Sequence, residues 1–180
     1  EWATAHAAKM LDSEHKVPCE LLGLPISLGA TDDYIMALHK MSGKAVPELI
    51  EFERGQVVDV MSDYNQYFFG KRVALAGDPD QLIGLVKLCI ELDMIPAYVV
   101  SGTPGNKFER TINEIVKGTP AEGITKVKCP GDLFILHQWI KQEPVDLIIG
   151  NTYCKYIARD EDIPHLRHGF PIVDRMGHTY

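Results

Sequence analysis

The stretch RVALAGDPD, residues 72–80, decides the fold class of this chain. An apolar, strand-like run ends at Gly77, the backbone turns at Asp78, and a helix-like run follows. This order is typical of a parallel strand whose carboxyl end meets the N-terminus of the next helix, and open α/β sheets bind ligands at that edge. Because a helix N-terminus favours negative charge, Asp78 or Asp80 is interpreted first as a helix cap, with a ligand-facing role as the alternative.

The alternation of strand-like and helix-like runs continues along the chain from this stretch. Apolar runs predict further strands at residues 95–102, 125–129 and 145–150, a possible fifth strand at 170–174, and helices at 81–92, 106–116 and 132–142. Helices between short strands favour right-handed crossovers and a parallel sheet. The expected fold class is therefore α/β, with a Rossmann-like parallel sheet of four to five strands flanked by helices and with an N-terminal helical extension.

Helical patterns dominate the N-terminal part of the chain. Residues 1–70 are expected to form a helical extension and connector, and residues 71–180 a Rossmann-like α/β domain. Apolar spacing predicts three helices: one that ends near His15, one that begins after Thr31 and ends at Gly43, and a long one that ends at Gly70.

Composition and charge narrow the classes of function. The net charge of -7 argues against a nucleic-acid surface, which normally carries a basic patch, so no nucleic-acid partner is expected. No apolar run approaches the length of a membrane span, so no membrane contact is expected. The chain starts at Glu1 without a methionine, and we interpret it as a piece of a longer polypeptide.

Four cysteines are scattered through the chain, at Cys19, Cys89, Cys129 and Cys154, and none belongs to a CxxC pair. The zinc-ribbon pattern is therefore absent. Cys89 lies in an apolar helical run and is expected to be a core residue, while the other three become candidate ligands only if they converge in space. Scattered cysteines in an acidic chain are typical of a reducing, cytoplasmic compartment.

The loops at the carboxyl edge of the predicted sheet contain polar residues but no phosphate-binding signature. GxGxxG and GxxxxGK[ST] are both missing, so a dinucleotide or a nucleoside triphosphate is not expected. A small-molecule site near Asp78, Ser101 and Asn151 is an alternative, to be tested with anionic ligands. His165 and His168 form the only close histidine pair, and we interpret them as two solvated imidazoles in a loop.

Asp59 and Asp63 lie four residues apart in the long predicted helix. This spacing places both carboxylates on one face, one turn apart, where like charges repel. A bound cation would remove the repulsion, but a hard cation needs about six oxygen ligands, so the others must come from water, backbone or another subunit. The alternative interpretation is an exposed acidic face without a ligand.

Four segments together resemble the nitrogenase component 1 family, in the C-terminal half of its beta chain. They are FERGQVVDVMSD, GKRVALAGDPD, IIGNTYCKYIARD and IPHLRHGFPIVDR, at residues 52–63, 70–80, 148–160 and 163–175. The resemblance covers most of the chain and implies a part of an oxidoreductase that reduces dinitrogen to ammonia. It also implies repeated Rossmann-like domains, an α2β2 assembly with an alpha chain and a second beta chain, and ATP-driven electron transfer from a separate iron protein (component 2).

The resemblance implies one metal site in this chain and one cofactor whose ligands lie outside it. The family's beta chains share the eight-iron P-cluster (8Fe-7S) with the alpha chain, but the ligands belong to an N-terminal domain without a counterpart here, so no cluster ligand and no catalytic residue is assigned. The family also has two aspartates four apart after ERG that help to bind a mononuclear metal ion between two beta chains. Asp59 and Asp63 match them, which implies a role as metal ligands.

Departures from the family pattern leave the subtype and the alternatives open. Cys154 stands where the family usually has glycine. The segment VDRMGH is closer to the vanadium and iron-only forms of the family, whereas GNTYCK is closer to the molybdenum form. The same superfamily includes scaffolds for cofactor assembly, which bind a cluster precursor without reducing dinitrogen. We expect a supporting piece of component 1 that is inactive by itself, with an assembly scaffold or a small-molecule-binding α/β domain as alternatives.

Overall fold

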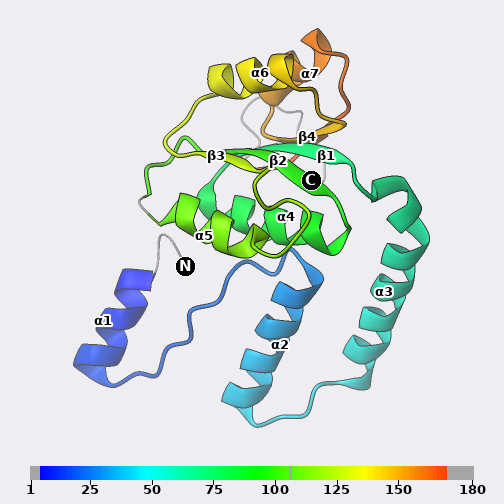
Figure 1. Ribbon diagram of the computed structural model, residues 1–180. Coiled ribbons are helices and arrows are strands. Elements are labelled where there is room, and N and C mark those ends of the chain that lie inside the picture. The colour runs from blue at the N-terminus through cyan, green and yellow to red at the C-terminus, as the bar shows by residue number, and fades with distance from the viewer. Residues whose placement is uncertain (1–4, 106, 170–180) are drawn as a thin grey trace.

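A five-stranded, all-parallel sheet forms the centre of the molecule (Figure 1), a computed structural model that describes residues 5–105 and 107–169. The strands are β1 (Arg72–Ala76), β2 (Ile95–Val100), β3 (Lys126–Lys128), β4 (Leu147–Gly150) and β5 (His165–Arg167). Their order in the sheet is β3-β2-β1-β4-β5. Strands β2 and β3 lie on one side of β1, and β4 and β5 lie on its other side. The strand order therefore reverses between β1 and β4, which is the topological switch point.

Helices cover both faces of this sheet (Figure 1), which confirms the expected α/β class. On one face lie α4 (Pro79–Glu91) and α5 (Phe108–Val116), and on the other lie α6 (Leu133–Gln142) and α7 (Cys154–Asp160). Each pair closes a separate apolar core against the sheet. Leu75 faces the first core and Ala74 the second, and neither side chain is exposed to solvent. Strands that are buried on both faces read as continuous apolar runs, which is why their positions were predictable.

The fifth strand differs from the expectation. Residues 170–174, which the apolar pattern favoured, lie outside the described residues. The strand that completes the sheet is β5, which pairs in parallel with β4 through the register Ile148↔His165 and Gly150↔Arg167. The segment that we interpreted as a loop with two histidines is therefore partly an edge strand.

Three helices precede the sheet: α1 (Ala5–His15), α2 (Leu28–Ser42) and α3 (Glu48–Phe68). They extend away from the α4 side of the sheet (Figure 1). Neither α1 nor α3 contains a buried residue. The division between residues 70 and 71 into extension and domain stays a prediction.

Helix α2 begins earlier than the sequence pattern indicated. Its N-cap is Ser27, whose Oγ accepts a hydrogen bond from Ala30 N at 3.2 Å, and not Thr31. The carboxylate of Glu91, at the end of α4, accepts from Leu28 N at 2.7 Å and Gly29 N at 3.0 Å, and so satisfies two more amides of the first turn. The helix ends as expected, because Gly43 adopts the left-handed conformation at a φ of 65°.

Across residues 5–105 and 107–169, the structure contains no helix with the length and apolar character that a membrane crossing requires.

Candidate functional site

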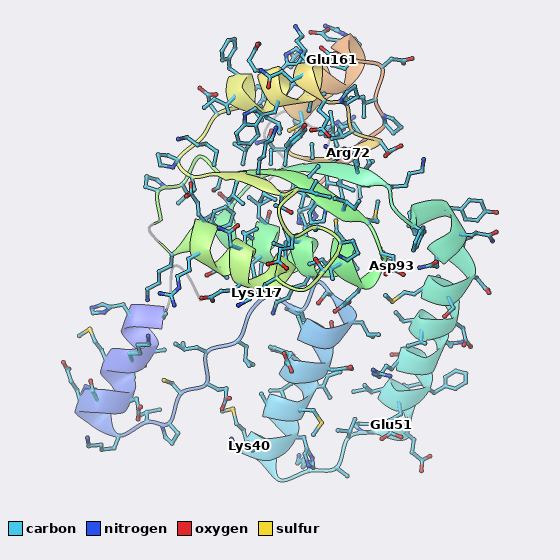
Figure 2. The ribbon with its side chains drawn as sticks, viewed as in Figure 1. Lys40, Glu51, Arg72, Asp93, Lys117 and Glu161 are labelled. Atoms are coloured by element: carbon cyan, nitrogen blue, oxygen red, sulfur yellow. The ribbon has the colours of Figure 1, made fainter. Side chains whose placement is uncertain are left out.

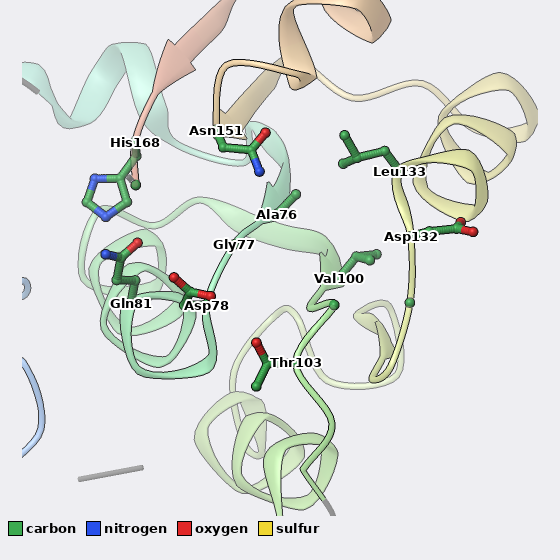
Figure 3. Close-up of a pocket in the computed structure, with 13 residues that line it drawn as sticks. Ala76, Gly77, Asp78, Gln81, Val100, Thr103, Asp132, Leu133, Asn151 and His168 are labelled. Atoms are coloured by element: carbon green, nitrogen blue, oxygen red, sulfur yellow. The ribbon is translucent and has the colours of Figure 1, made fainter. Parts of the chain in front are cut away.

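A cavity of about 410 Å³ opens at the carboxyl edge of the sheet, above the ends of β1, β2 and β4 (Figure 3). This is the edge and the switch point where open α/β sheets bind ligands, and the volume lies in the usual range for small molecules. Its walls come from five loops, one after each strand, and from the start of α6. The lining residues are Ala76, Gly77, Asp78, Gln81, Val100, Gly102, Thr103, Gly131, Asp132, Leu133, Asn151, His168 and Gly169.

Gly150 allows β4 to lie close to β1 and α7 beneath this cavity. A Cβ atom at Gly150 would lie 2.8 Å from the carbonyl oxygen of Ala76 and 2.7 Å from Sγ of Cys154. Both distances are shorter than real Cβ contacts, so the strand pair and the start of α7 can adopt this spacing only with glycine here. The switch point is therefore set by backbone packing rather than by a side chain.

Asp78 occupies the N-cap position of α4, as predicted, but its side chain makes no capping hydrogen bond. Pro79 takes the first helical position, where its missing N–H costs nothing. The Asp78 carboxylate instead turns toward the cavity and lies near Gln81 (Figure 3). Of the two interpretations of this carboxylate, the structure favours the one in which it faces a ligand.

Ser101 does not line the cavity, although the sequence placed it there. It is fully buried, and its Oγ accepts from Thr103 N at 3.3 Å. The residue that faces the cavity from this loop is Thr103, which the sequence did not single out (Figure 3). Asn151 lines the cavity as predicted, with its Oδ1 occupied by Tyr153 N at 3.0 Å and its amide nitrogen turned inward.

The interpretation of His165 and His168 as two solvated imidazoles is wrong. His165 lies in β5, where its Nε2 is 3.2 Å from the carbonyl oxygen of Gly150. His168 lines the cavity, its backbone N donates to the same carbonyl at 2.9 Å, and its Nε2 is buried without a hydrogen-bond partner among the described residues. Burial lowers the pKa of His168 from its ordinary value of 6.5, which favours the neutral ring.

The lowered pKa of His168 makes stability depend on pH. Because the unfolded chain keeps the ordinary pKa of 6.5, it gains the proton first, and stability that is present above pH 6.5 is lost as the pH falls toward the lower folded-state pKa. We expect His168→Asn to lose less unfolding free energy than the parent between pH 7.5 and pH 5.5, as measured by denaturant titration. His15→Asn, at an exposed position on α1, should lose as much as the parent; equal losses in all three proteins would contradict the prediction.

Asp59 and Asp63 lie on α3, far along the chain from this cavity, and both are exposed. They share one helix face, as the spacing predicted. Within residues 5–105 and 107–169, no group of three or more histidine, cysteine, aspartate or glutamate side chains converges on a point where a metal ion would fit. The two aspartates therefore form at most part of a coordination shell, and their role as ligands stays a prediction.

Two of the four cysteines, Cys89 and Cys154, do not fit an iron–sulfur cluster. Cys89 is part of the core, as predicted, and burial raises the pKa of its thiol to about 12. Burial also raises the pKa of Cys154 to about 11. A cluster needs thiolates, and these two side chains are held as thiols in apolar cores. Cys129 donates to the carbonyl oxygen of Thr103 at 3.0 Å.

Comparisons with known proteins identify the family. A family model described as "Nitrogenase component 1 type Oxidoreductase" matches residues 1–180, and the chain belongs to this family. It is 54% identical over 179 residues to the nitrogenase molybdenum-iron protein beta chain of Clostridium pasteurianum, covering 99% of this chain and 39% of that relative. The beta chain of Azotobacter vinelandii is 32% identical, with 97% of this chain and 35% of the relative covered.

The fold agrees with a solved structure of the same family. "Nitrogenase Cp1 at pH 6.5" matches with a TM-score of 0.89 and 54% identity, over 95% of this chain and 37% of that chain. The chain thus spans about two fifths of the Clostridium relative, at 39%, and the resemblance to component 1 in its sequence is confirmed.

Proposed function

We propose that this chain forms the C-terminal part of a nitrogenase component 1 beta chain, which supports ATP-driven electron transfer and dinitrogen reduction in a cytoplasmic α2β2 assembly. One observation carries the proposal: 99% of the chain aligns at 54% identity with a beta chain of that enzyme. Its partners are then an alpha chain, a second beta chain and the iron protein. Because Cys89 and Cys154 do not fit a cluster, we assign the P-cluster (8Fe-7S) ligands to the remainder of the beta chain.

The exposed surface of α3 supports a contact with another chain. This helix has 21 residues and none of them is buried, yet it carries large apolar side chains (Figure 2). Phe52 and Tyr67 are 64% and 63% exposed, and helical spacing places both on the same face as Asp59 and Asp63. Leu49, Val60 and Tyr64 are also more than half exposed and lie on or beside this face. A stripe of exposed apolar side chains of this kind is typical of a protein interface. We therefore propose that α3 forms the contact between the two beta chains.

Asp59 and Asp63 are proposed as ligands of a mononuclear metal ion at this contact. Two exposed carboxylates on one helix face repel each other, and a cation relieves the repulsion. The chain supplies two oxygen-bearing side chains of the roughly six ligands that a hard cation takes, so the partner beta chain would complete the shell. The metal would then hold the two beta chains together without taking part in the reduction.

This metal assignment predicts that Asp59→Asn lowers the metal content of the purified assembly. An amide oxygen replaces a charged ligand, so we expect a loss of affinity of about tenfold, measured by elemental analysis after dialysis against a chelator. Glu51→Gln is the matched control, because it removes a charge from the same helix about 12 Å away along its axis. Equal metal content in the Asp59→Asn variant and the parent would rule out this ligand.

Reconstitution tests the function itself. The beta chain that contains this sequence is purified with its alpha chain and supplied with iron protein, ATP and dinitrogen. We expect ammonia to form with the complete assembly and not with the 180-residue chain alone. A complete assembly that holds a cluster precursor but forms no ammonia would indicate the assembly scaffold instead, and ammonia from the chain alone would contradict the supporting role.

A further inference from the structure

We propose that the cavity at the carboxyl edge of the sheet binds a small organic cation that carries an ammonium group and hydroxyl groups. The cavity has an inward-facing carboxylate, several neutral hydrogen-bonding side chains and an apolar wall. This site is separate from Asp59 and Asp63, and it needs neither the cluster nor the partner chains of the proposed assembly.

The charged side chains that line the cavity favour a cation as the ligand. Among the residues that the structure describes, the lining includes two carboxylates, those of Asp78 and Asp132, and neither a lysine nor an arginine. Asp132 caps α6, with its Oδ1 accepting from Ile135 N at 2.9 Å, and its side chain points away from the cavity (Figure 3). Asp78 points inward, and no residue that the structure describes forms a hydrogen bond or ion pair with its carboxylate. A full negative charge therefore faces the cavity without a protein cation to neutralise it.

The N-terminus of α4 lies beside this carboxylate and opposes it only in part. A helix terminus carries the equivalent of roughly half a positive charge, whereas the Asp78 carboxylate carries a full negative one. The start of α6 adds a second such half charge, and Asp132 caps that helix, so the two carboxylates together exceed the two helix termini. The sum stays negative, which favours a cation over an anion. On this proposal, the anionic ligands that the sequence suggested for this edge bind more weakly than a cation.

The neutral groups around Asp78 fit hydroxyl groups of a ligand. The hydroxyl of Thr103, the carboxamides of Gln81 and Asn151, and the imidazole of His168 all line the cavity. Nε2 of His168 is buried and finds no hydrogen-bond partner in residues 5–105 and 107–169. Because this atom has no accessible surface, a ligand in the cavity does not reach it, and the hydroxyl contacts fall to Thr103, Gln81 and Asn151. Leu133 points into the same space and supplies the apolar wall (Figure 3).

Three probes of matched shape test the proposal: serinol, which carries an ammonium group and two hydroxyls, glycerol, which is neutral, and glycerate, which is anionic. Their affinities for the purified protein are measured by NMR titration. We expect serinol to bind about threefold more tightly than glycerol, since Asp78 is exposed and water screens the charge pair that it would form. Glycerate should bind more weakly than both.

Two single substitutions, Asp78→Asn and Thr103→Val, test whether serinol binds in this cavity, and a third, Asp132→Asn, is their control. Asp78→Asn should weaken the binding of serinol about threefold and leave the binding of glycerol unchanged, because it removes only the charge. Asp132→Asn is the matched control, since its carboxylate points away and asparagine also caps helices, so serinol should bind as to the parent. Thr103→Val, a variant that keeps the charge, should weaken serinol and glycerol alike.

Thermal unfolding of each variant shows whether it is folded before it is titrated. Three results would overturn the proposal: no binding of serinol, equal binding of the three probes, or serinol binding that Asp78→Asn does not weaken.

Discussion

Replacing Phe108 with alanine should lower the free energy of unfolding of this chain by about 4 kcal/mol, the middle of the range for truncating a buried aromatic side chain. Phe108 opens α5 and is fully buried in the core between that helix, α4 and the sheet. Truncation removes the largest side chain of α5 from this core and leaves a cavity that the flanking strands cannot close. Denaturant titration measures the loss, which is a large share of the total stability of an ordinary domain.

Phe134→Ala is the matched control for this change. Phe134 lies in α6, on the other side of the sheet, and is 70% exposed, so we expect its truncation to change stability by less than about 0.5 kcal/mol. The two substitutions alter composition identically and differ only in burial. If both cost the same, the core described between α4, α5 and the sheet is not the one that stabilises the chain.

The central strands could be predicted from sequence because a strand that is buried on both faces consists of consecutive apolar residues. β1, β2 and β4 are each covered on both faces, so almost every residue in them is apolar and no alternation is needed. β5 could not be predicted in the same way. It has three residues, and among the described strands it pairs only with β4. Its Leu166 is 55% exposed, so the place of β5 in the sheet depends on backbone hydrogen bonds that leave no side-chain pattern.

The start of α2 shows a second limit, set by a contact that is distant in sequence. Ser27 and Thr31 are both residue types that cap helices, and the local pattern favoured Thr31. The structure selects Ser27 because Glu91, more than 60 residues away, accepts from the amides of the first turn. Only the packing of α2 against α4 supplies that acceptor.

The cavity was predictable in position but only partly in composition. The rule for open α/β sheets places a site where β1 ends, and Asp78 and Asn151 line it as the loops suggested. Ser101 and Thr103 lie two residues apart in one loop, and sequence alone does not show which one turns inward. His168 was misjudged because the edge strand that carries it past the cavity was not recognised.

Replacing Gly150 with alanine should cost about 3 kcal/mol, the upper part of the usual range for overpacking a core. The added methyl group would lie 2.8 Å from the carbonyl oxygen of Ala76, and backbone in the ladder between β1 and β4 cannot move aside as a flexible side chain can. Sγ of Cys154, at 2.7 Å, blocks the other direction, and this side chain is fully buried. We expect the strand pair to separate at its carboxyl end, which would also distort the cavity.

Gly77→Ala separates this steric effect from the general effect of adding a methyl group at the same edge. A Cβ atom at Gly77 meets only the side chain of Leu82, at 3.8 Å, which is ordinary van der Waals contact. We expect a change in unfolding free energy of less than about 1 kcal/mol for this variant, measured beside Gly150→Ala in the same denaturant titration. Gly150 ends β4 and Gly77 directly follows β1, so both glycines lie beside the switch point. Equal costs would therefore mean that the close approach of β4 to β1 is not what requires glycine at Gly150. A larger cost at Gly150 alone would show that backbone packing sets the spacing of the two strands beneath the cavity.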